Sequence, residues 1–510
     1  MSLETELKLQ IEPRHFARLA AHPLLKSAAG RATRRLYSVY YDTSDLDLWR
    51  AGVTLRLRRS GRHWVQTVKS GGGIAAGLHQ RQEIETALTA QLPDFESLQT
   101  SEVAAHFSAP GLRARLKPLI VTVFTRTSCL LRPADGVAIE ISLDRGHIKS
   151  GDATAPLCEL ELEMKEGPAW RAYQLAMQLV ETIPLLVEDR SKAERGIALH
   201  VGTQEKPLKV RRSLVAAGMC TNDVFTTLIL GCLAHYTANQ RGMLDRGEPE
   251  YLHQMRVALR RLRSVFSTFA PFFPPSVLAP PVTETRWLAR ILGAARDWDV
   301  FATETLPPVI GRYAGHDGLA SLARATARKR AAANGRARRA VASARGQGLL
   351  LALGAWTSAE TWLEALDGAQ RAGLARPADE FARETLEAAL KRVRKRGRKF
   401  AQLGPRDLHR LRISAKKLRY ATEFFAPLFD DRAAGDYRAA LARLQDALGS
   451  YNDAVKMTTF AERASRGLTG AAVNEARGIM LGWGAGMEDA GTRYLRRVWK
   501  DFRAIGPFWK

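Results

Sequence analysis

The chain of 510 residues is too long for a single hydrophobic core, and its hydrophobic fraction of 46% is ordinary for a globular protein. Its net charge of +25 is unusual and unevenly distributed. Residues 1–205 contain 26 Lys and Arg against 24 Asp and Glu, whereas residues 206–510 contain 51 against 28. We therefore expect at least two domains, and a polyanionic partner for the second.

The cysteines and the apolar runs exclude several protein classes. The chain has four cysteines without C-x-x-C or other metal spacing: Cys129, Cys158, Cys220 and Cys232. This usage is typical of reduced cytosolic thiols. Charged strand sequence begins at Glu4, so no signal peptide is expected, and the runs Leu228–Leu233 and Leu349–Leu353 are too short to span a bilayer. We expect a soluble, cytoplasmic protein without a membrane partner.

The first segment of interest is Glu4–Lys8, in which two carboxylates and an ammonium alternate with Thr5 and Leu7. On a strand these three charges share one face. Such a face is either solvated or lines a charged cavity, and five residues alone favour the solvated interpretation. Next, Glu12–Ala29 has the apolar spacing of a helix.

A series of strand-like segments with one charged and one apolar face follows. They are 39–43, 53–59, 64–69, 79–85, 121–131, 137–143 and 157–165. With the first segment they predict about eight strands. Whole strands carry one sign of charge, such as Arg56 and Arg58 on one, and Glu159, Glu161 and Glu163 on another. This segregation favours a barrel in which carboxylates hold Mg²⁺ or Mn²⁺ and the opposite wall binds phosphates.

Other routes to phosphate chemistry have no support in the sequence. The run Gly71–Gly73 lacks a following Gly-Lys-Ser/Thr, so we expect a flexible hairpin loop there and not a phosphate cradle. No Ser-His-Asp arrangement suggests a covalent nucleophile.

The motifs of the first part occur together in a known family. In order they are E-T-E-L-K, Y-D-T, L-R-L-R, T-V-K, R-Q-E-I-E, E-I-S-L-D-R-G, E-L-E-L-E-M-K and S-K-A-E-R-G. This part resembles the CYTH domain of the triphosphate tunnel metalloenzymes. The resemblance implies an eight-stranded antiparallel tunnel that acts on triphosphates with a divalent metal, Mg²⁺ or Mn²⁺.

The resemblance also implies roles for individual residues. The metal-binding carboxylates would be Glu4, Glu6, Glu161 and Glu163. Glu159 shares their strand face, so which two of the three glutamates on that strand bind metal stays open. The triphosphate-binding cations would be Lys8, Arg56, Arg58, Lys69, Arg81, Arg126 and Lys192. The catalytic set would be Glu4, Glu6, Lys8, Arg56, Arg58 and Lys69. Glu83 and Asp144 are weaker candidates, either as metal contacts or as residues that hold the metal ligands in place.

The second part is helical in pattern and contains an internal repeat. The segment 252–273 matches 408–429 without gaps, and 292–297 matches 448–453 at the same offset. The second copy departs from the first where Asn452 replaces Arg296 and Val455 replaces Asp299. We therefore predict an all-α duplicated bundle with pseudo-twofold symmetry.

Each copy carries a basic stripe with a leading histidine, at relative helix positions 0, 3, 7 and 10. The residues are His253, Arg256, Arg260 and Arg263, and His409, Arg412, Lys416 and Arg419. The paired L-H-x-x-R motifs resemble the CHAD domain, which implies binding of inorganic polyphosphate. Whether the two histidines donate to phosphate or hydrogen-bond within the bundle stays open.

Together these patterns predict an α+β multidomain protein. We expect the tunnel domain at 1–203, a linker at 204–212 and the helical domain at 213–510, with repeats at 220–370 and 376–510. The predicted function is metal-dependent hydrolysis of inorganic triphosphate, with polyphosphate recruited by the helical domain or the enzyme placed on polyphosphate-rich bodies. The alternatives are an organic triphosphate substrate, cyclisation, or a non-catalytic polyanion scaffold. Nucleic acid ranks lowest as a partner because the basic helices offer few aromatic stacking platforms.

Overall fold

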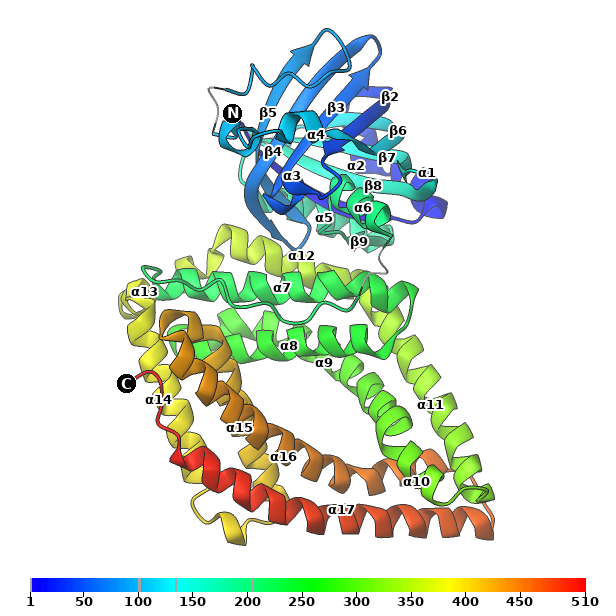
Figure 1. Cartoon of the computed structure of the whole chain (residues 1–510), viewed down its shortest axis with the longest axis vertical. Coiled ribbons are helices and arrows are strands. Elements are labelled where there is room, and N and C mark those ends of the chain that lie inside the picture. The colour runs from blue at the N-terminus through cyan, green and yellow to red at the C-terminus, as the bar shows by residue number, and fades with distance from the viewer. Residues whose placement is uncertain (1, 100–101, 134, 203–205) are drawn as a thin grey trace. The chain divides into compact units, whose positions relative to one another are not determined.

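The computed structural model describes residues 2–99, 102–133, 135–202 and 206–510. They form two compact units (Figure 1). The first comprises residues 1–207 and 342–361, and the second comprises residues 208–341 and 362–510. The chain therefore crosses between the units three times. Among the described residues, none of the helices is long and apolar enough to cross a membrane.

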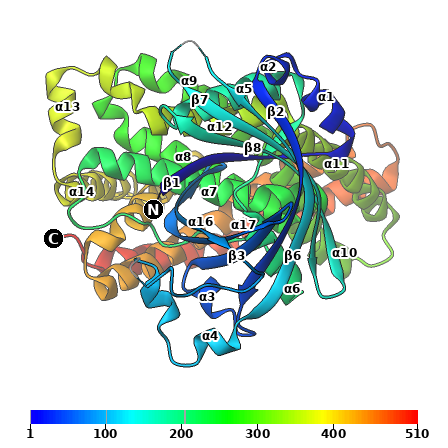
Figure 2. The same cartoon turned by 90° about the horizontal axis from the view of Figure 1, so that it is seen from above.

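The first unit is built on a closed antiparallel β-barrel, whose strands curve around a common interior in Figure 2. Its strands are β1 Ser2–Ile11, β2 Ala29–Asp42, β3 Val53–Ser60, β4 His63–Ala75, β5 Leu78–Leu88, β6 Lys117–Leu131, β7 Ala138–Ser150 and β8 Ala153–Glu166. Within the described residues the order is β5-β4-β3-β2-β6-β7-β8-β1, and β1 pairs back with β5. The predicted eight-stranded barrel is confirmed. A short strand, β9 Leu185–Val187, adds to β1 beyond the ring.

The alternation in β1 shows how the barrel separates charge from apolar surface. Leu7 and Leu9 are fully buried, as core residues of the unit. Residues of the opposite parity, Glu4, Glu6 and Lys8, line an interior cavity. The polar face of the first strand is therefore enclosed, and it is not the solvated face that these five residues alone favoured.

Helices and short turns surround the barrel. The first unit contains α1 Phe16–Ala20, α2 Pro23–Lys26, α3 Asp47–Arg50, α4 Leu112–Arg115, α5 Trp170–Thr182, α6 Lys192–Val201 and, from much later in the chain, α12 Ala344–Ala359. The single helix expected over 12–29 is wrong. A 3₁₀ turn begins at Pro13 and α2 begins at Pro23, because proline favours the first position of a helix over its interior.

The glycine run at Gly71–Gly73 is not a loop. It lies inside β4, at a bulge between Ser70 and Gly73, and the hairpin turn comes later at Ala76 and Gly77. Gly72 has φ of +88°, and a Cβ there would lie 1.7 Å from the backbone oxygen of Gln80. Glycine is required because β5 approaches the bulge so closely.

The second unit is all-helical, as predicted. It contains α7 Thr221–Asp245, α8 Pro249–Phe269, α9 Pro275–Val300, α10 Leu306–Arg312, α11 Asp317–Ala342, α13 Gly368–Ala375, α14 Ala378–Arg396, α15 Pro405–Phe425, α16 Asp431–Ser465 and α17 Ala471–Ala504. Both ends of α15 lie 156 residues after those of α8, the offset of the sequence repeat. The copies differ where a π-helical segment, Phe301–Thr305, follows α9, since α16 continues unbroken through the equivalent positions.

Candidate functional site

The barrel encloses a cavity of about 650 Å³, within the range of small-molecule sites. Every residue that the sequence analysis placed in the metal and triphosphate sets lines it: Glu4, Glu6, Lys8, Arg56, Arg58, Lys69, Arg81, Arg126, Glu161, Glu163 and Lys192. The strands bring all but one of these side chains together, because each strand contributes the inward-facing parity of its residues. The exception is Lys192, which is the first residue of α6. Their individual roles stay predictions.

One wall of the cavity is a row of carboxylates. Strand register places Glu6 on β1 opposite Glu163 on β8, and Glu163 opposite Glu140 on β7. Burial raises the pKa of Glu163, and the Glu140 and Glu6 carboxylates add to the rise against the opposing Lys165. Burial next to Glu6 likewise raises the pKa of Glu4. The wall thus concentrates negative charge that an added cation would relieve.

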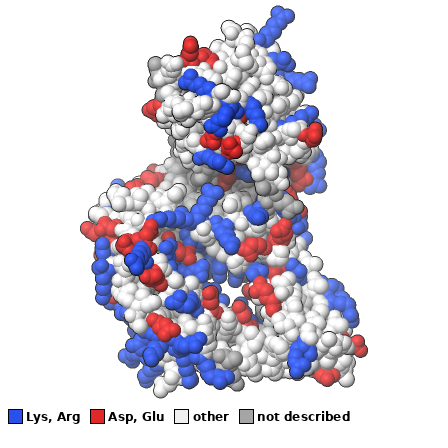
Figure 3. All heavy atoms as spheres, in the orientation of Figure 1, with Lys and Arg blue, Asp and Glu red and all other residues white. Residues whose placement is uncertain are grey.

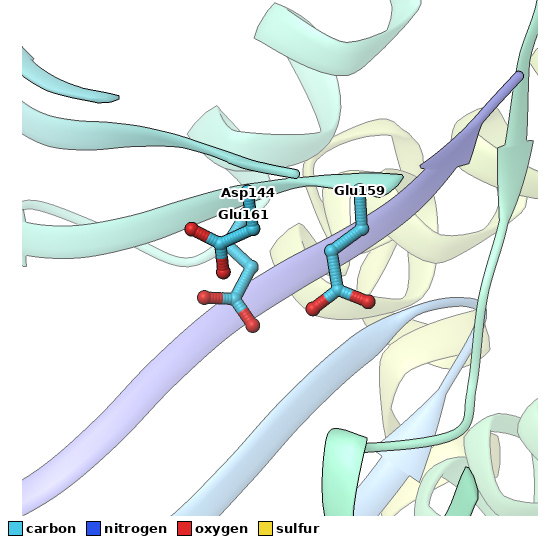
Figure 4. A group of neighbouring side chains, drawn as sticks. All are labelled: Asp144, Glu159 and Glu161. Carbon is cyan, nitrogen blue, oxygen red and sulfur yellow. The ribbon is translucent and has the colours of Figure 1, made fainter. Parts of the chain in front are cut away.

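A second, deeper acidic group comes from β7 and β8: Asp144, Glu159 and Glu161 (Figure 4). One carboxylate oxygen from each lies within 4.8 Å of the others, a spacing that could hold a metal ion. In the structure the Lys192 ammonium bonds all three, at 2.8 Å from both Asp144 and Glu161 and in a short contact with Glu159. Here a lysine supplies the positive charge.

These buried pairs set the ionisation of the deeper group. Burial opposes the charged form of Glu161, but Lys192 and Lys8 outweigh it and hold the pKa of Glu161 well below its ordinary value. Arg126 donates to both oxygens of Asp144, at 2.8 and 2.6 Å. Glu159 also accepts from Arg195 at 3.0 Å and does not line the cavity. This placement separates Glu159 from the row that contains Glu163.

The opposite wall carries cations from β3, β4 and β5. Lys69 bonds Glu4 and lies 3.4 Å from Glu83. Arg58 donates to Ser38 at 3.2 Å and forms no ion pair with a carboxylate among the described residues. Burial and the neighbouring Arg56 guanidinium lower the pKa of Arg58 to about 10, which still leaves it charged at neutral pH. Arg58 is therefore available to a phosphate.

The structure adds lining residues that sequence reasoning missed. They include Tyr40, Thr54, Thr67, Glu85, Glu140, Lys165 and Ser191. Glu140 shares the parity of Asp144 on its strand, which was a usable signal. Lys165 contacts Glu163 and lies 3.8 Å from Glu140, so it neutralises part of the carboxylate row.

The helical unit contains a cluster of cations at the contact between α8 and α15, formed by Arg256, Arg260, Arg412 and Lys416. Burial and the three guanidinium groups lower the pKa of Lys416 to about 7. The Nε atoms of Arg260 and Arg412 are buried without a hydrogen-bond partner among the described residues. Asp297 is a weak counter-ion, 3.9 Å from Arg256. Asp453 adds a second negative charge near Arg412 and Lys416. Even so, Arg260, Arg412 and Lys416 form no ion pair with a carboxylate among the described residues, unlike the lysines of the barrel.

The remaining residues of the two basic stripes have other close neighbours besides this cluster. Arg419 bonds Glu423 at 2.6 Å and Gln445 at 3.1 Å, while Arg263 lies near Arg286 on α9. His409 Nδ1 lies 2.9 Å from Asn452 Oδ1, a bond within the bundle. Burial and the Arg296 guanidinium lower the pKa of His253 to about 4. The stripes therefore converge at their middle positions.

Exposed basic side chains also cover parts of the helical unit. Figure 3 shows a dense group of Lys and Arg near the end of α14 and the adjoining part of α17. The segment just after α14 packs on α17, since the ring centroids of Phe400 and Trp499 stack 5.3 Å apart and Gly397 leaves room for the indole ring. The excess positive charge of the unit is thus distributed over a broad surface as well as in the cluster.

Comparison with known proteins follows the division into a barrel and a bundle. Residues 2–197 match the CYTH domain and residues 227–462 match the CHAD domain. The inorganic triphosphatase of Haemophilus influenzae is 30% identical over 213 residues, which cover 39% of this chain and 55% of that protein. The match thus spans about half the length of this curated relative. The crystal structure of the CHAD domain from the plant Ricinus communis is 31% identical, with a TM-score of 0.51, and covers 59% of this chain and 98% of that one.

Proposed function

We propose, because the chain carries a CYTH domain followed by a CHAD domain, that it hydrolyses inorganic triphosphate to diphosphate and phosphate in the barrel and binds polyphosphate through the helical domain. The observation that carries the proposal is the cavity, where a carboxylate row faces a wall of cations. The similarity to an inorganic triphosphatase supports it. A metal-bound polyphosphate needs both kinds of wall.

The carboxylate row fits a divalent metal such as Mg²⁺ or Mn²⁺. Its donors are the hard oxygen ligands that these ions prefer. Glu4, Glu6 and Glu163, with Glu140 beside them, would hold the metal, because strand register places Glu6, Glu163 and Glu140 side by side along this wall and Glu4 shares the inward face of Glu6. Glu161 bonds Lys8, Arg126 and Lys192, which weakens its case as a direct ligand.

The residues of the cavity then divide the work of hydrolysis. When bound, the metal would neutralise phosphate oxygens and lower the pKa of an attacking water. Arg58 and Arg56 would bind the phosphate chain from the opposite wall and stabilise charge on the leaving group. Lys8, 2.7 Å from Glu6, would neutralise negative charge where carboxylates and phosphates come together. No covalent intermediate is required.

The helical domain would bind polyphosphate at the cluster of Arg256, Arg260, Arg412 and Lys416. Four cations in contact repel one another, and a polyanion relieves that repulsion. The unpartnered Nε atoms of Arg260 and Arg412 support this assignment, since they are donors without an acceptor in the described residues. The cluster would recruit long chains, or place the enzyme where polyphosphate accumulates.

Phosphate release from inorganic triphosphate, ATP and long-chain polyphosphate, with Mg²⁺ or Mn²⁺, tests the proposal. We expect the fastest turnover with triphosphate, loss of turnover with a chelator, and loss in a Glu4→Gln/Glu6→Gln variant. Glu166→Gln is the matched control, because Glu166 ends β8 outside the cavity and is exposed. Faster turnover of ATP would favour an organic triphosphate. No turnover of any substrate would overturn the hydrolase proposal.

A further inference from the structure

A side chain from a later part of the chain hydrogen-bonds β9, the short strand that pairs with β1 beyond the barrel ring. The Val187 N–H donates to Gln347 Oε1 at 2.9 Å, across 160 residues of sequence. Gln347 is 1% exposed and lies on α12. An edge strand leaves N–H groups without a partner strand, and here the glutamine supplies the acceptor.

Helix α12 is a fixed part of the first unit. It packs on α5, and α5 contacts the barrel strands β1 and β8. Gly354 allows this close approach, since a Cβ at that position would lie 2.4 Å from the ring of Tyr173. The position of Gln347 is therefore set by a buried helix–helix contact and not by a mobile segment.

The segment that begins at β9 hydrogen-bonds the backbone of Lys8. The Glu188 N–H donates to the Lys8 carbonyl at 3.1 Å. The Lys8 N–H donates to Gly77, whose own N–H donates to Asp189 Oδ1 at 2.6 Å. At Lys8, strand β1 changes its partner from β5 to β9. Both backbone groups of Lys8 thus depend on the segment that begins at β9.

The same segment also places Lys192. Ser191 follows β9 by four residues and caps α6 in a reciprocal pair with Glu194, and Lys192 is the first residue of that helix. Its ammonium then bonds Asp144, Glu159 and Glu161. A shift of β9 would therefore move two of the cations that line the cavity.

We propose that Gln347 is a positioning residue of the barrel site, acting through β9 on Lys8 and Lys192. The inference rests on the proposed triphosphatase function for its kinetic consequence only. Residues 342–361 belong to the first unit, whereas the chain on either side of them belongs to the second. The sequence of the helical part therefore supplies a component of the catalytic frame, and residues 1–207 lack it.

The test compares two substitutions on α12 in the full chain. Gln347→Met keeps the length of the side chain and removes the acceptor for Val187. Thr357→Val is the matched control, because Thr357 is also buried and bonds the carbonyls of Leu353 and Gly354 in its own helix. Hydrogen exchange of residues 185–192 and steady-state kinetics with triphosphate are measured well below the melting temperature of each variant.

We expect Gln347→Met to lose exchange protection in 185–192 while β7 stays protected, and to lower kcat/KM about tenfold, chiefly through KM. Thr357→Val should stay within about twofold of the wild type in kcat/KM. Unchanged protection at 185–192, or equal kinetic effects of the two variants, would overturn the proposal. If the wild type does not hydrolyse triphosphate, the proposed function fails, and exchange together with triphosphate affinity decides the positioning role.

Discussion

The two units use buried and half-buried charge in opposite ways. In the barrel, Lys8, Lys69 and Lys192 each contact a carboxylate, and the pKa of Lys8 is raised because Glu161 and Glu6 outweigh the effect of burial. In the helical unit, Lys416 lies among arginines, and burial and repulsion lower its pKa to about 7. The barrel site contains charges of both signs, whereas the α8–α15 cluster is mostly positive.

This contrast in charge predicts different ligands for the two sites. Paired charges neutralise one another in the free protein, so a metal and a phosphate would enter the barrel together and exchange partners with its lysines and glutamates. Unpaired cations repel one another until a polyanion arrives. The comparison therefore predicts that substituting a carboxylate of the cavity affects the barrel alone, and that substituting a cation of the α8–α15 cluster affects the helical site alone.

The largest effect is expected from Glu6→Gln. Glu6 is buried, which opposes its ionisation, yet Lys8 holds its pKa at about 2, so the carboxylate is charged at neutral pH. Neutralising it should lower kcat/KM for triphosphate by roughly 10³-fold, because metal binding and the orientation of Lys8 both depend on it. Polyphosphate affinity, measured on the same sample, should not change. A loss of both would contradict the separation of the sites.

Asp144→Asn should weaken the fold of the barrel. Asp144 is fully buried and contacts both Arg126 and Lys192. Removing one partner of a buried pair leaves uncompensated charge, at a cost of about 3 kcal/mol in the free energy of unfolding. Denaturant unfolding measures the change. Asp45→Asn is the control, since the exposed pair of Asp45 with Arg115 should contribute almost nothing. Equal effects of the two substitutions would refute the buried network.

Arg260→Ala combined with Arg412→Ala should weaken polyphosphate binding by about tenfold or more, and should reduce its salt dependence, because two cations are lost from the cluster. Triphosphate kinetics should stay unchanged. Fluorescence titration with long-chain polyphosphate at several salt concentrations measures both quantities. Arg324→Ala, an exposed arginine on α11, is the control. Equal losses in the control would mean that binding depends on total charge.

The smallest effect concerns pH. Because the pKa of Lys416 is lowered to about 7, the side chain is mostly neutral at pH 8.5 and mostly charged at pH 6. Polyphosphate favours the charged form, so affinity should fall a few-fold between these values. Stability should rise with pH from about 7 towards the ordinary lysine value of 10.5, since the unfolded chain there binds the proton that the folded chain lacks. Lys416→Arg should flatten both profiles. Unchanged profiles would contradict the repulsion.

The barrel could be predicted because the alternation of residues within each strand indicates which side chains face inward. Alternation places Glu4, Glu6 and Lys8 on one side without any knowledge of the partner strands. The repeat likewise predicted the helical part, since its copies are separated by a constant offset. The bulge at Gly72 could not be predicted, because it depends on how closely β5 approaches, and a glycine run alone equally suits a loop.

Contacts between residues far apart in the sequence were the main features that could not be predicted. The Gln347–Val187 bond joins residues 160 apart, and no local pattern indicates that a helix in the basic half covers a strand of the barrel. Lys192 was predicted as a phosphate ligand from its motif, whereas its position among three carboxylates depends on register between β7 and β8. The roles of the predicted site residues await the experiments above.

We propose that one chain carries two phosphate sites of different electrostatic design. Measuring triphosphate turnover and polyphosphate affinity side by side in the wild type, Glu6→Gln and Arg260→Ala/Arg412→Ala tests it most directly. We expect Glu6→Gln to lose triphosphate turnover and keep polyphosphate binding, and the double arginine variant to keep turnover and lose binding. If either variant loses both properties while remaining folded, the two sites are not independent and the proposal is wrong.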